Sequence, residues 1–265
     1  MNRTHLVFLI FLNVASMLIP LPGSSQSLEL YQAGQIEVDT LNMPFRLLVP
    51  KQYNANKKYP LIVFLHGSGE RGNDNQLQLT HGAAYFASDS IRDKYPAFVL
   101  FPQCPPGKVW HNGTYVMGKQ HRLYSFPKKK MENPSLELVE AILKSLHKEY
   151  NIDNRRIYIG GLSIGGMGTF EIVRRNPRLF AAAFPICGGA NPDIAKKLKG
   201  PDWWIFHGEA DDVVPAELSV NMFYAIKERN PEIKLSIYEG VKHDSWTNAF
   251  NEPGLMEWLF SKRRN

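Results

Sequence analysis

A serine flanked by glycines stands in the middle of this chain, where residues 161–165 read Gly-Leu-Ser-Ile-Gly. This run follows a short apolar stretch at residues 156–160 and precedes a segment with the pattern of a helix. The order strand, G-x-S-x-G, helix is the sequence form of a nucleophile elbow, in which the glycines permit a sharp turn that exposes the serine hydroxyl beside a helix N-terminus. The pattern predicts that Ser163 is a nucleophile.

A serine hydroxyl is a poor nucleophile near neutral pH, so it needs a base to take its proton and an acid to orient that base. In this strand and helix arrangement the chain order is serine, then Asp or Glu, then His, each at the carboxyl end of a strand. Of the eight histidines, only His207 and His243 follow Ser163. No strand end with an acid lies between Ser163 and His207, so we predict that His243 is the base.

The acid is expected in the loop that contains residues 207–215, which reads H-G-E-A-D-D-V-V-P. Two aspartates, Asp211 and Asp212, compete for the role. We predict Asp211, because the pattern H-G-x-x-D-x-x-V-P places the acid there and neighbouring loop residues rarely point the same way. Asp212 is then expected to be exposed. Taken alone, such a pair is typical of a solvated turn or a helix cap, but its position between Ser163 and His243 favours catalysis.

Acyl transfer also needs backbone N–H groups that stabilise the developing oxyanion. One donor comes from the residue after the nucleophile, Ile164, and we predict that the other is the N–H of Ser68, in the glycine-rich loop after the third expected strand. The glycines of that loop permit a close approach to substrate, although such turns are also ordinary loops. His66, which opens the loop, is expected to be structural.

The substrate pocket is expected between residues 104–134 and Trp246. Residues 103–133 have no clear periodicity, and a loop this long in a compact domain is typically functional or disordered. Its aromatic content, with Trp110 as a wall, suits a sugar ring or an aromatic acyl group. Trp246 either forms the opposite wall or packs in the core. Arg71 either forms an ion pair with Glu70 or binds a substrate carboxylate.

The sequence contains no H-E-x-x-H, no paired cysteine spacing, no P-loop and no G-x-G-x-x-G after a strand, so we expect no metal and no cofactor. The formal net charge is +6, but lysines and arginines are mostly scattered, with clusters only at residues 128–130 and 262–264. This distribution is typical of solvated faces and argues against nucleic acid as a partner. The expected partner is a small-molecule or carbohydrate ester; the oligomeric state stays open.

Strands and helices that could position these residues alternate along the chain. We expect eight strands, at residues 28–39, 41–50, 59–65, 97–102, 156–160, 180–186, 203–206 and 234–238. Helices are expected within residues 77–88, from Asn133 and Pro134, after Ser163, from residue 191, over residues 216–228 and at the C-terminus. Continuous apolar runs such as residues 59–65 are typical of strands covered on both faces. The pattern predicts an α/β domain with a mostly parallel eight-stranded sheet and helices on both faces.

The first 25 residues have the features of a secretory signal peptide. Arg3 precedes an apolar run over residues 6–19, which proline and small residues follow. The run is shorter than the roughly 20 residues of a membrane span, and no cysteine offers a lipid attachment point at the expected cut near Ser25 or Ser27. We therefore predict an exported protein, periplasmic or secreted and free of the membrane after cleavage, with residues 26–265 as one catalytic domain.

Cys104 and Cys187 are the two cysteines of the chain. An oxidising compartment would permit a disulfide. In the strand order expected here they follow strands three places apart, about 14 Å at the usual sheet spacing, whereas a disulfide needs Cα atoms within about 7 Å. We predict two unpaired thiols.

Five segments together resemble the α/β-hydrolase superfamily, and within it a group of exported bacterial esterases and predicted peptidases related to polyhydroxybutyrate-depolymerase-like, feruloyl and acetylxylan esterases. They are L-H-G-S-G-E-R-G at residues 65–72, F-P-Q-C-P at 101–105, G-L-S-I-G-G-M-G at 161–168, H-G-E-A-D-D-V-V-P at 207–215 and H-D-S-W at 243–246. Ile164 departs from the methionine more usual in this group, but only its backbone is needed. The resemblance implies serine-dependent ester hydrolysis (EC 3.1.1.-) through an acyl-enzyme, on a sheet with strand order 1-2-4-3-5-6-7-8 whose second strand is antiparallel.

Two other functions remain open at this point. A serine peptidase would use the same triad, although the chain has room for the catalytic domain only, without an added gating domain, which favours esters. A non-catalytic binding protein on the same fold is the second alternative, and the presence of all three triad residues argues against it.

Overall fold

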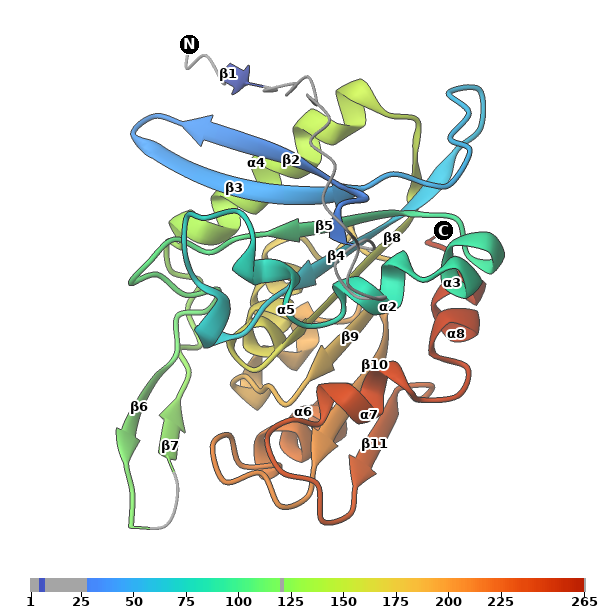
Figure 1. Cartoon of the computed structure of the whole chain (residues 1–265). Coiled ribbons are helices and arrows are strands. Elements are labelled where there is room, and N and C mark those ends of the chain that lie inside the picture. Colours follow the sequence, from blue (N-terminus) through green and yellow to red (C-terminus); the bar gives the residue numbers. More distant parts are fainter. Residues whose placement is uncertain (1–4, 8–27, 120–121, 265) are drawn as a thin grey trace, which may run out of the picture.

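The computed structural model describes residues 5–7, 28–119 and 122–264, and among them a nine-stranded sheet forms the centre of the molecule (Figure 1). Its strands are β1 (His5–Val7), β2 (Tyr31–Val38), β3 (Leu41–Leu48), β4 (Tyr59–Leu65), β5 (Phe98–Pro102), β8 (Ile152–Leu162), β9 (Ala182–Ile186), β10 (Asp202–Gly208) and β11 (Lys234–Tyr238). Their order is β1-β2-β3-β5-β4-β8-β9-β10-β11. β3 pairs antiparallel with β5, and the strands from β5 to β11 are parallel.

From β2 onward, this order confirms the eight-stranded arrangement predicted from the sequence. β1 is an addition, since it pairs antiparallel with β2 at the edge of the sheet. Its residues fall within the predicted signal peptide. The rest of that segment, residues 1–4 and 8–25, lies outside the described residues, so the signal peptide remains a prediction.

Helices cover both faces of the sheet. They are α2 (Ala83–Ala87), α3 (Asp89–Lys94), α4 (Pro134–Glu149), α5 (Ile164–Arg175), α6 (Glu217–Lys227), α7 (Trp246–Phe250) and α8 (Leu255–Ser261), with shorter 3-10 turns η1 (Ser68–Glu70), η2 (Leu77–Leu79) and η3 (Pro192–Lys197). One apolar core joins the sheet to α4, α5, η3 and α6, and a second joins its other face to η2, α2, α7 and α8. The helix predicted within residues 77–88 is confirmed as α2, and the structure adds the 3-10 turn η2 before it and α3 after it.

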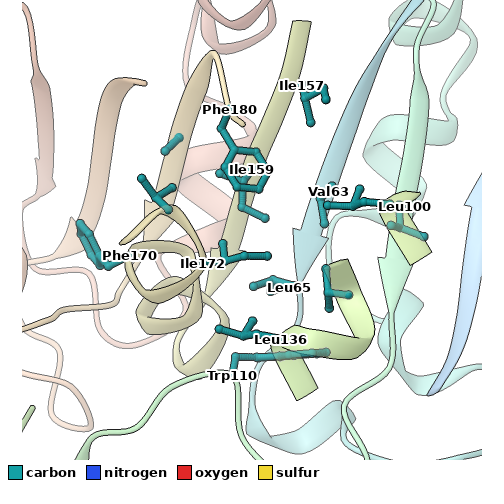
Figure 2. Packing of buried hydrophobic residues seen from close by; sticks show 14 of the residues in the cluster. Val63, Leu65, Leu100, Trp110, Leu136, Ile157, Ile159, Phe170, Ile172 and Phe180 are labelled. Carbon is teal, nitrogen blue, oxygen red and sulfur yellow. The ribbon is translucent and has the colours of Figure 1, made fainter. Parts of the chain in front are cut away.

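The first core packs around the strand that leads to the serine. Figure 2 shows Ile157 and Ile159 of β8 beside Val63 of β4, with Phe170 and Ile172 of α5 nearby. All five side chains are at most 1% exposed. The burial of their apolar surface, at about 25 cal/mol per Å², fixes the end of β8 and the start of α5 relative to the rest of the sheet.

The sequence of α4, the helix before β8, explains why it packs on the first core. The side chain of Asn133 accepts a hydrogen bond from the Leu136 N–H at 3.1 Å, and Pro134 occupies the first turn, where its missing N–H costs nothing. Leu136, Val139, Ile142, Leu143 and Leu146 are then buried along one side of α4. The predicted start of this helix is confirmed.

The segment predicted to be an aperiodic loop contains a small two-stranded sheet. β6 (Thr114–Met117) pairs antiparallel with β7 (Arg122–Ser125), and this hairpin extends away from the main sheet (Figure 1). All four residues of β6 are exposed. β6 therefore lacks the alternation of buried and exposed residues that identifies a strand in the sequence, and β7 alternates only between partly buried and exposed residues.

Candidate active site

The predicted nucleophile stands on a strained turn between β8 and α5. Ser163 has φ 55° and ψ −118°, outside the ordinary regions for a non-glycine residue. Neither flanking glycine leaves room for a side chain. A Cβ added to Gly161 would lie 2.5 Å from the Gly165 carbonyl oxygen, and a Cβ added to Gly165 would lie 2.0 Å from the carbonyl oxygen of Leu65. The local chain is therefore built as the elbow that the sequence predicted.

The three side chains predicted to form a triad meet at one end of the sheet. His243 Nε2 lies 3.0 Å from Ser163 Oγ, and His243 Nδ1 lies 2.7 Å from Asp211 Oδ2. Because an ionised carboxylate only accepts hydrogen bonds, the ring proton belongs on Nδ1, which leaves Nε2 free to accept the serine proton. This arrangement allows the serine to be deprotonated as it attacks a carbonyl.

The carboxylate of Asp211 is buried and fully hydrogen bonded. Oδ1 accepts the backbone N–H groups of Val213 and Val214 at 2.9 and 2.8 Å, while Oδ2 faces His243 and His207. Burial alone would raise the pKa of Asp211, but the bonds from His207, His243 and Val214 hold it well below its usual value. Asp211 is therefore ionised across the whole neutral range.

The competing aspartate points elsewhere. Asp212 is exposed, and its carboxylate lies 3.6 Å from the ammonium of Lys242. The sequence expectation that the two neighbours diverge, with Asp212 at the surface, is confirmed.

The two predicted oxyanion donors begin helical turns beside the serine. Ile164 is the first residue of α5 and Ser68 the first of η1, and N–H groups at such positions have no carbonyl partner within their own helix. A Cβ placed on Gly67 would lie 3.8 Å from the Cβ of Ser163, so this loop lies directly against the elbow. The geometry is compatible with both donors facing one reacting carbonyl.

His66 holds this loop from inside, as expected of a structural residue. Its Nε2 accepts the Cys104 N–H at 2.9 Å, so its proton sits on Nδ1, which donates to the Gly67 carbonyl at 2.6 Å. Burial lowers the pKa of His66 to about 4. A neutral ring of fixed tautomer thus ties the loop to the end of β5.

Trp110 is not a pocket wall, which corrects the prediction. It is fully buried, it donates from Nε1 to the His66 carbonyl at 3.1 Å, and it packs with Leu65 and Leu136 in the core (Figure 2). A Cβ on Gly168 of α5 would lie 2.4 Å from its Cβ. The indole supports the loop from behind and has no surface to offer a substrate.

Trp246 lies at the site. Its ring centroid is 5.7 Å from that of His243 and 4.8 Å from that of His81, and the residue is only partly buried. Arg71 is also partly exposed; it donates from Nε to the Ser68 carbonyl at 2.9 Å and so braces the oxyanion loop. Glu70 instead faces His81, with Oε1 3.7 Å from Nε2. Trp246 and Arg71 therefore remain candidate pocket residues.

The structure adds neighbours of the site that sequence reasoning missed. His207 contacts Asp211, Cys187 Sγ accepts the Ser163 N–H at 3.3 Å, and the Tyr124 hydroxyl of the hairpin donates to the Val213 carbonyl at 3.3 Å. The position of His207 in H-G-x-x-D was a usable signal, because His207 is the last residue but one of β10, the strand that precedes the acid. No local pattern marks Cys187 or Tyr124.

Both cysteines are unpaired and buried, as predicted. Cys104 belongs to the first core, and its Sγ lies 3.6 Å from the Ser135 hydroxyl. Burial raises the pKa of this thiol to about 12. Cys187, in contrast, lies next to the predicted triad.

Comparison with known proteins finds that the chain is similar to several esterases. Residues 52–252 match the family model described as Phospholipase/Carboxylesterase. A bifunctional acetylxylan esterase/xylanase of Neocallimastix patriciarum is 39% identical over 163 residues, which is 61% of this chain but 20% of that protein. The crystal structure of a thermostable esterase is 37% identical, with a TM-score of 0.81 over 90% of this chain and 64% of the other. The chain thus spans less than two thirds of either relative.

A ferulic acid esterase from Anaeromyces mucronatus, solved with ferulic acid, shares the fold at a TM-score of 0.61 and 15% identity, over 85% of this chain and 90% of the other. Within the part of the chain that the structure describes, no helix has the length and apolar character of a membrane span.

Proposed function

The chain belongs to the phospholipase/carboxylesterase family of α/β-hydrolases, and we propose that it hydrolyses carboxylic esters through an acyl-enzyme formed on Ser163. The observation that carries this proposal is the unbroken series of hydrogen-bond contacts from Ser163 Oγ through His243 to Asp211. It supplies a nucleophile, a base and an acid in the order and geometry that acyl transfer to water requires.

In the proposed reaction, Ser163 Oγ attacks the ester carbonyl while His243 Nε2 takes its proton. Asp211 stays ionised, keeps the ring in its tautomer and stabilises the imidazolium that forms. The N–H groups of Ser68 and Ile164 stabilise the oxyanion, and removal of such a donor costs about 10²–10³ in rate in other enzymes. His243 then gives the proton to the leaving alcohol. In the second half of the reaction water attacks the acyl-enzyme while His243 takes its proton, and His243 returns that proton to Ser163 Oγ as the carboxylic acid is released.

The relatives and the site support a substrate class. The match to part of a bifunctional acetylxylan esterase/xylanase supports a small or carbohydrate-linked ester, and the half-buried Trp246 beside His243 offers an apolar surface to a sugar ring or an aromatic acyl group. Arg71 donates to the Ser68 carbonyl of the oxyanion loop and is partly exposed, which supports it as a residue that binds a substrate carboxylate. The predicted signal peptide makes the protein exported, periplasmic or secreted, and N-terminal sequencing of exported protein tests this by a start near Ser25 or Ser27.

A fluorophosphonate probe tests the nucleophile directly, because it reacts with an activated serine. We expect the wild type to be labelled and Ser163→Ala to remain unlabelled, while Ser90→Ala, which changes an exposed serine of α3, is labelled like the wild type. Equal labelling of wild type and Ser163→Ala, or no labelling of either, would favour a non-catalytic binding protein.

The leaving group is tested by comparing rates on a nitrophenyl acetate and a peptide anilide, with acetylated xylan and feruloyl sugars screened beside them. We expect ester hydrolysis that Ser163→Ala abolishes. A higher kcat/KM on the anilide than on every ester would replace the esterase proposal with a peptidase.

A further inference from the structure

The described residues contain a group of metal-ligating side chains that comes from three separate parts of the sequence. Cys187 Sγ, a carboxylate oxygen of Asp211 and a ring nitrogen of His243 all lie within 4.8 Å of one another. Cys187 follows β9, Asp211 follows β10 and His243 follows β11, which are adjacent strands in the sheet (Figure 1). A search for local ligand spacing in the sequence cannot find such a group.

The donor set suits a thiophilic divalent cation. Thiolate, imidazole and carboxylate are the ligands of protein-bound Zn²⁺, with bonds of about 2.0–2.3 Å, which place the ligand atoms of a tetrahedral site about 3.3–3.8 Å apart. The separation between His243 Nδ1 and Asp211 Oδ2 is 2.7 Å and has to widen by about 0.6 Å, whereas the separations that involve Cys187 Sγ are within 4.8 Å and have to shrink by about 1.5 Å at most. Asp211 and Cys187 are deeply buried, whereas 20% of the His243 side chain is exposed. A cation would enter from the histidine side.

The surroundings of the sulfur also contain a negative charge. The ionised carboxylate of Asp211 lies within 4.8 Å of Cys187 Sγ, so a cation bound between the two is attracted to it. The Ser163 N–H donates to Cys187 Sγ at 3.3 Å, and this bond strengthens when the sulfur becomes an anionic ligand.

We propose that Cys187, Asp211 and His243 form an inhibitory binding site for a thiophilic divalent cation, of which Zn²⁺ is the common example. On binding, the metal–sulfur bond forms as the thiol proton leaves to solvent. The cation takes the lone pair of His243 Nδ1, so the single proton of the neutral ring moves to Nε2. Nε2 then no longer accepts the Ser163 proton, and the base is blocked. Binding itself is independent of the proposed function; the inhibition rests on it.

Cobalt titration tests the site without any activity. Co²⁺ added to the full chain gives a thiolate-to-cobalt charge-transfer band only if a cysteine sulfur binds it. We expect this band at one Co²⁺ per chain in the wild type, in Ser163→Ala and in Cys104→Ala, which removes the other buried thiol. We expect no band in Cys187→Ala. A wild type without the band, or a band that survives Cys187→Ala, overturns the proposal.

Inhibition provides the second test, with each variant compared to its own metal-free rate on a nitrophenyl acetate. At a Zn²⁺ concentration that lowers the wild-type and Cys104→Ala rates tenfold, we expect Cys187→Ala to lose less than half of its rate, which is a shift in apparent affinity of at least about ninefold, or about 1.3 kcal/mol. Cys187→Ser, which keeps the side-chain shape, is the alternative if Cys187→Ala does not fold. Equal Zn²⁺ sensitivity with and without the Cys187 sulfur overturns the inhibitory role, whereas a wild type inactive on every ester overturns the proposed function and leaves the cobalt result to stand.

Discussion

His207 Nε2 lies 3.2 Å from Oδ2 of Asp211, the same carboxylate oxygen that His243 Nδ1 meets at 2.7 Å. The Val214 carbonyl, 2.9 Å away, is a second acceptor for His207 Nε2, so this nitrogen must carry a proton. His207 is completely buried, with its Nδ1 2.7 Å from the Ser219 hydroxyl. Two histidines therefore share Oδ2 of Asp211: His243, which is partly exposed beside Ser163, and His207, which is enclosed in the protein.

Replacement of His207 tests whether this second bond positions the acid. His207→Leu removes the donor, and we expect kcat/KM on a nitrophenyl ester to fall about 10- to 100-fold, as for the loss of a hydrogen bond to a charged group. His207→Gln places an amide N–H near the former Nε2, and we expect it to recover most of the lost rate. Equal losses in both variants, with unchanged near-UV circular dichroism, would mean that the ring serves only to fill space.

The choice of acid is tested by a matched pair of neighbours. Asp211→Asn removes the charge that orients His243, and a fall of about 10⁴-fold in kcat is expected from the corresponding change in another triad. Asp212→Asn changes an exposed side chain, and we expect kcat to stay within about twofold. Steady-state kinetics on one ester measure both kcat values. A larger loss of kcat in Asp212→Asn than in Asp211→Asn would assign Asp212 as the acid.

The oxyanion loop offers a second matched pair. A Cβ on Gly67 would lie 2.7 Å from a methyl carbon of Leu162 and 3.0 Å from Glu70 Oε2, whereas a Cβ on Gly69 meets nothing within 4 Å. In Gly67→Ala either these two side chains or the loop that carries the Ser68 N–H must move, and because Leu162 is buried we expect the loop to move and kcat to fall by up to about 10²-fold with little change in KM. Gly69→Ala serves as the control. Full kcat in Gly67→Ala would contradict this expected displacement of the loop.

Trp246 is expected to act on substrate binding. Trp246→Ala removes an aromatic surface beside His243, and we expect KM for a feruloyl ester to rise about 2- to 10-fold, the range of an aromatic contact. Trp246→Phe should retain part of the effect, and KM for a nitrophenyl acetate should change less. A drop in kcat for all esters with unchanged KM would assign Trp246 to the support of His243 instead.

Stability at acid pH should depend on the neutral histidine under the oxyanion loop. Burial lowers the pKa of His66 from 6.5 to about 4, so between these values the unfolded chain binds more protons than the folded one. The free energy of unfolding should therefore fall as the pH drops through this window, by up to about 3 kcal/mol from this residue.

His66→Asn, which retains a donor near the Nδ1 position, should flatten this dependence. His111, whose pKa burial also lowers to about 4, contributes with the same sign in both proteins. Urea unfolding at about pH 7 and about pH 5 measures the difference. An equal loss of stability in wild type and His66→Asn would contradict it.

The sequence was sufficient for the features that depend on chain order and local sterics. The position of Ser163 required glycines at 161 and 165, because a Cβ on either would collide with a carbonyl oxygen. The continuous apolar runs of β4 and β5 identified strands covered on both faces. The choice of Asp211 over Asp212 rested on the same kind of local argument, and the structure brings Asp211 to His243.

Two features of the segment before α4, and one after β9, could not be predicted from local sequence. Nothing in the local pattern distinguishes Trp110, which is enclosed against Gly168, from an aromatic residue that meets solvent. β6 is exposed along its length, so its pairing with β7 leaves no trace of buried positions in the sequence. The contact of Cys187 with the triad depends on the packing of β9 beside β10, which only the assembled sheet provides.

The close approach of Gly165 to the carbonyl oxygen of Leu65 joins the start of α5 to the end of β4. Because backbone meets backbone there, no side-chain rearrangement can reposition the serine without disturbing the central strands. Any change in what the site binds is therefore expected in the surrounding loops, such as the stretch bearing Trp246, while Ser163 Oγ stays in a fixed place.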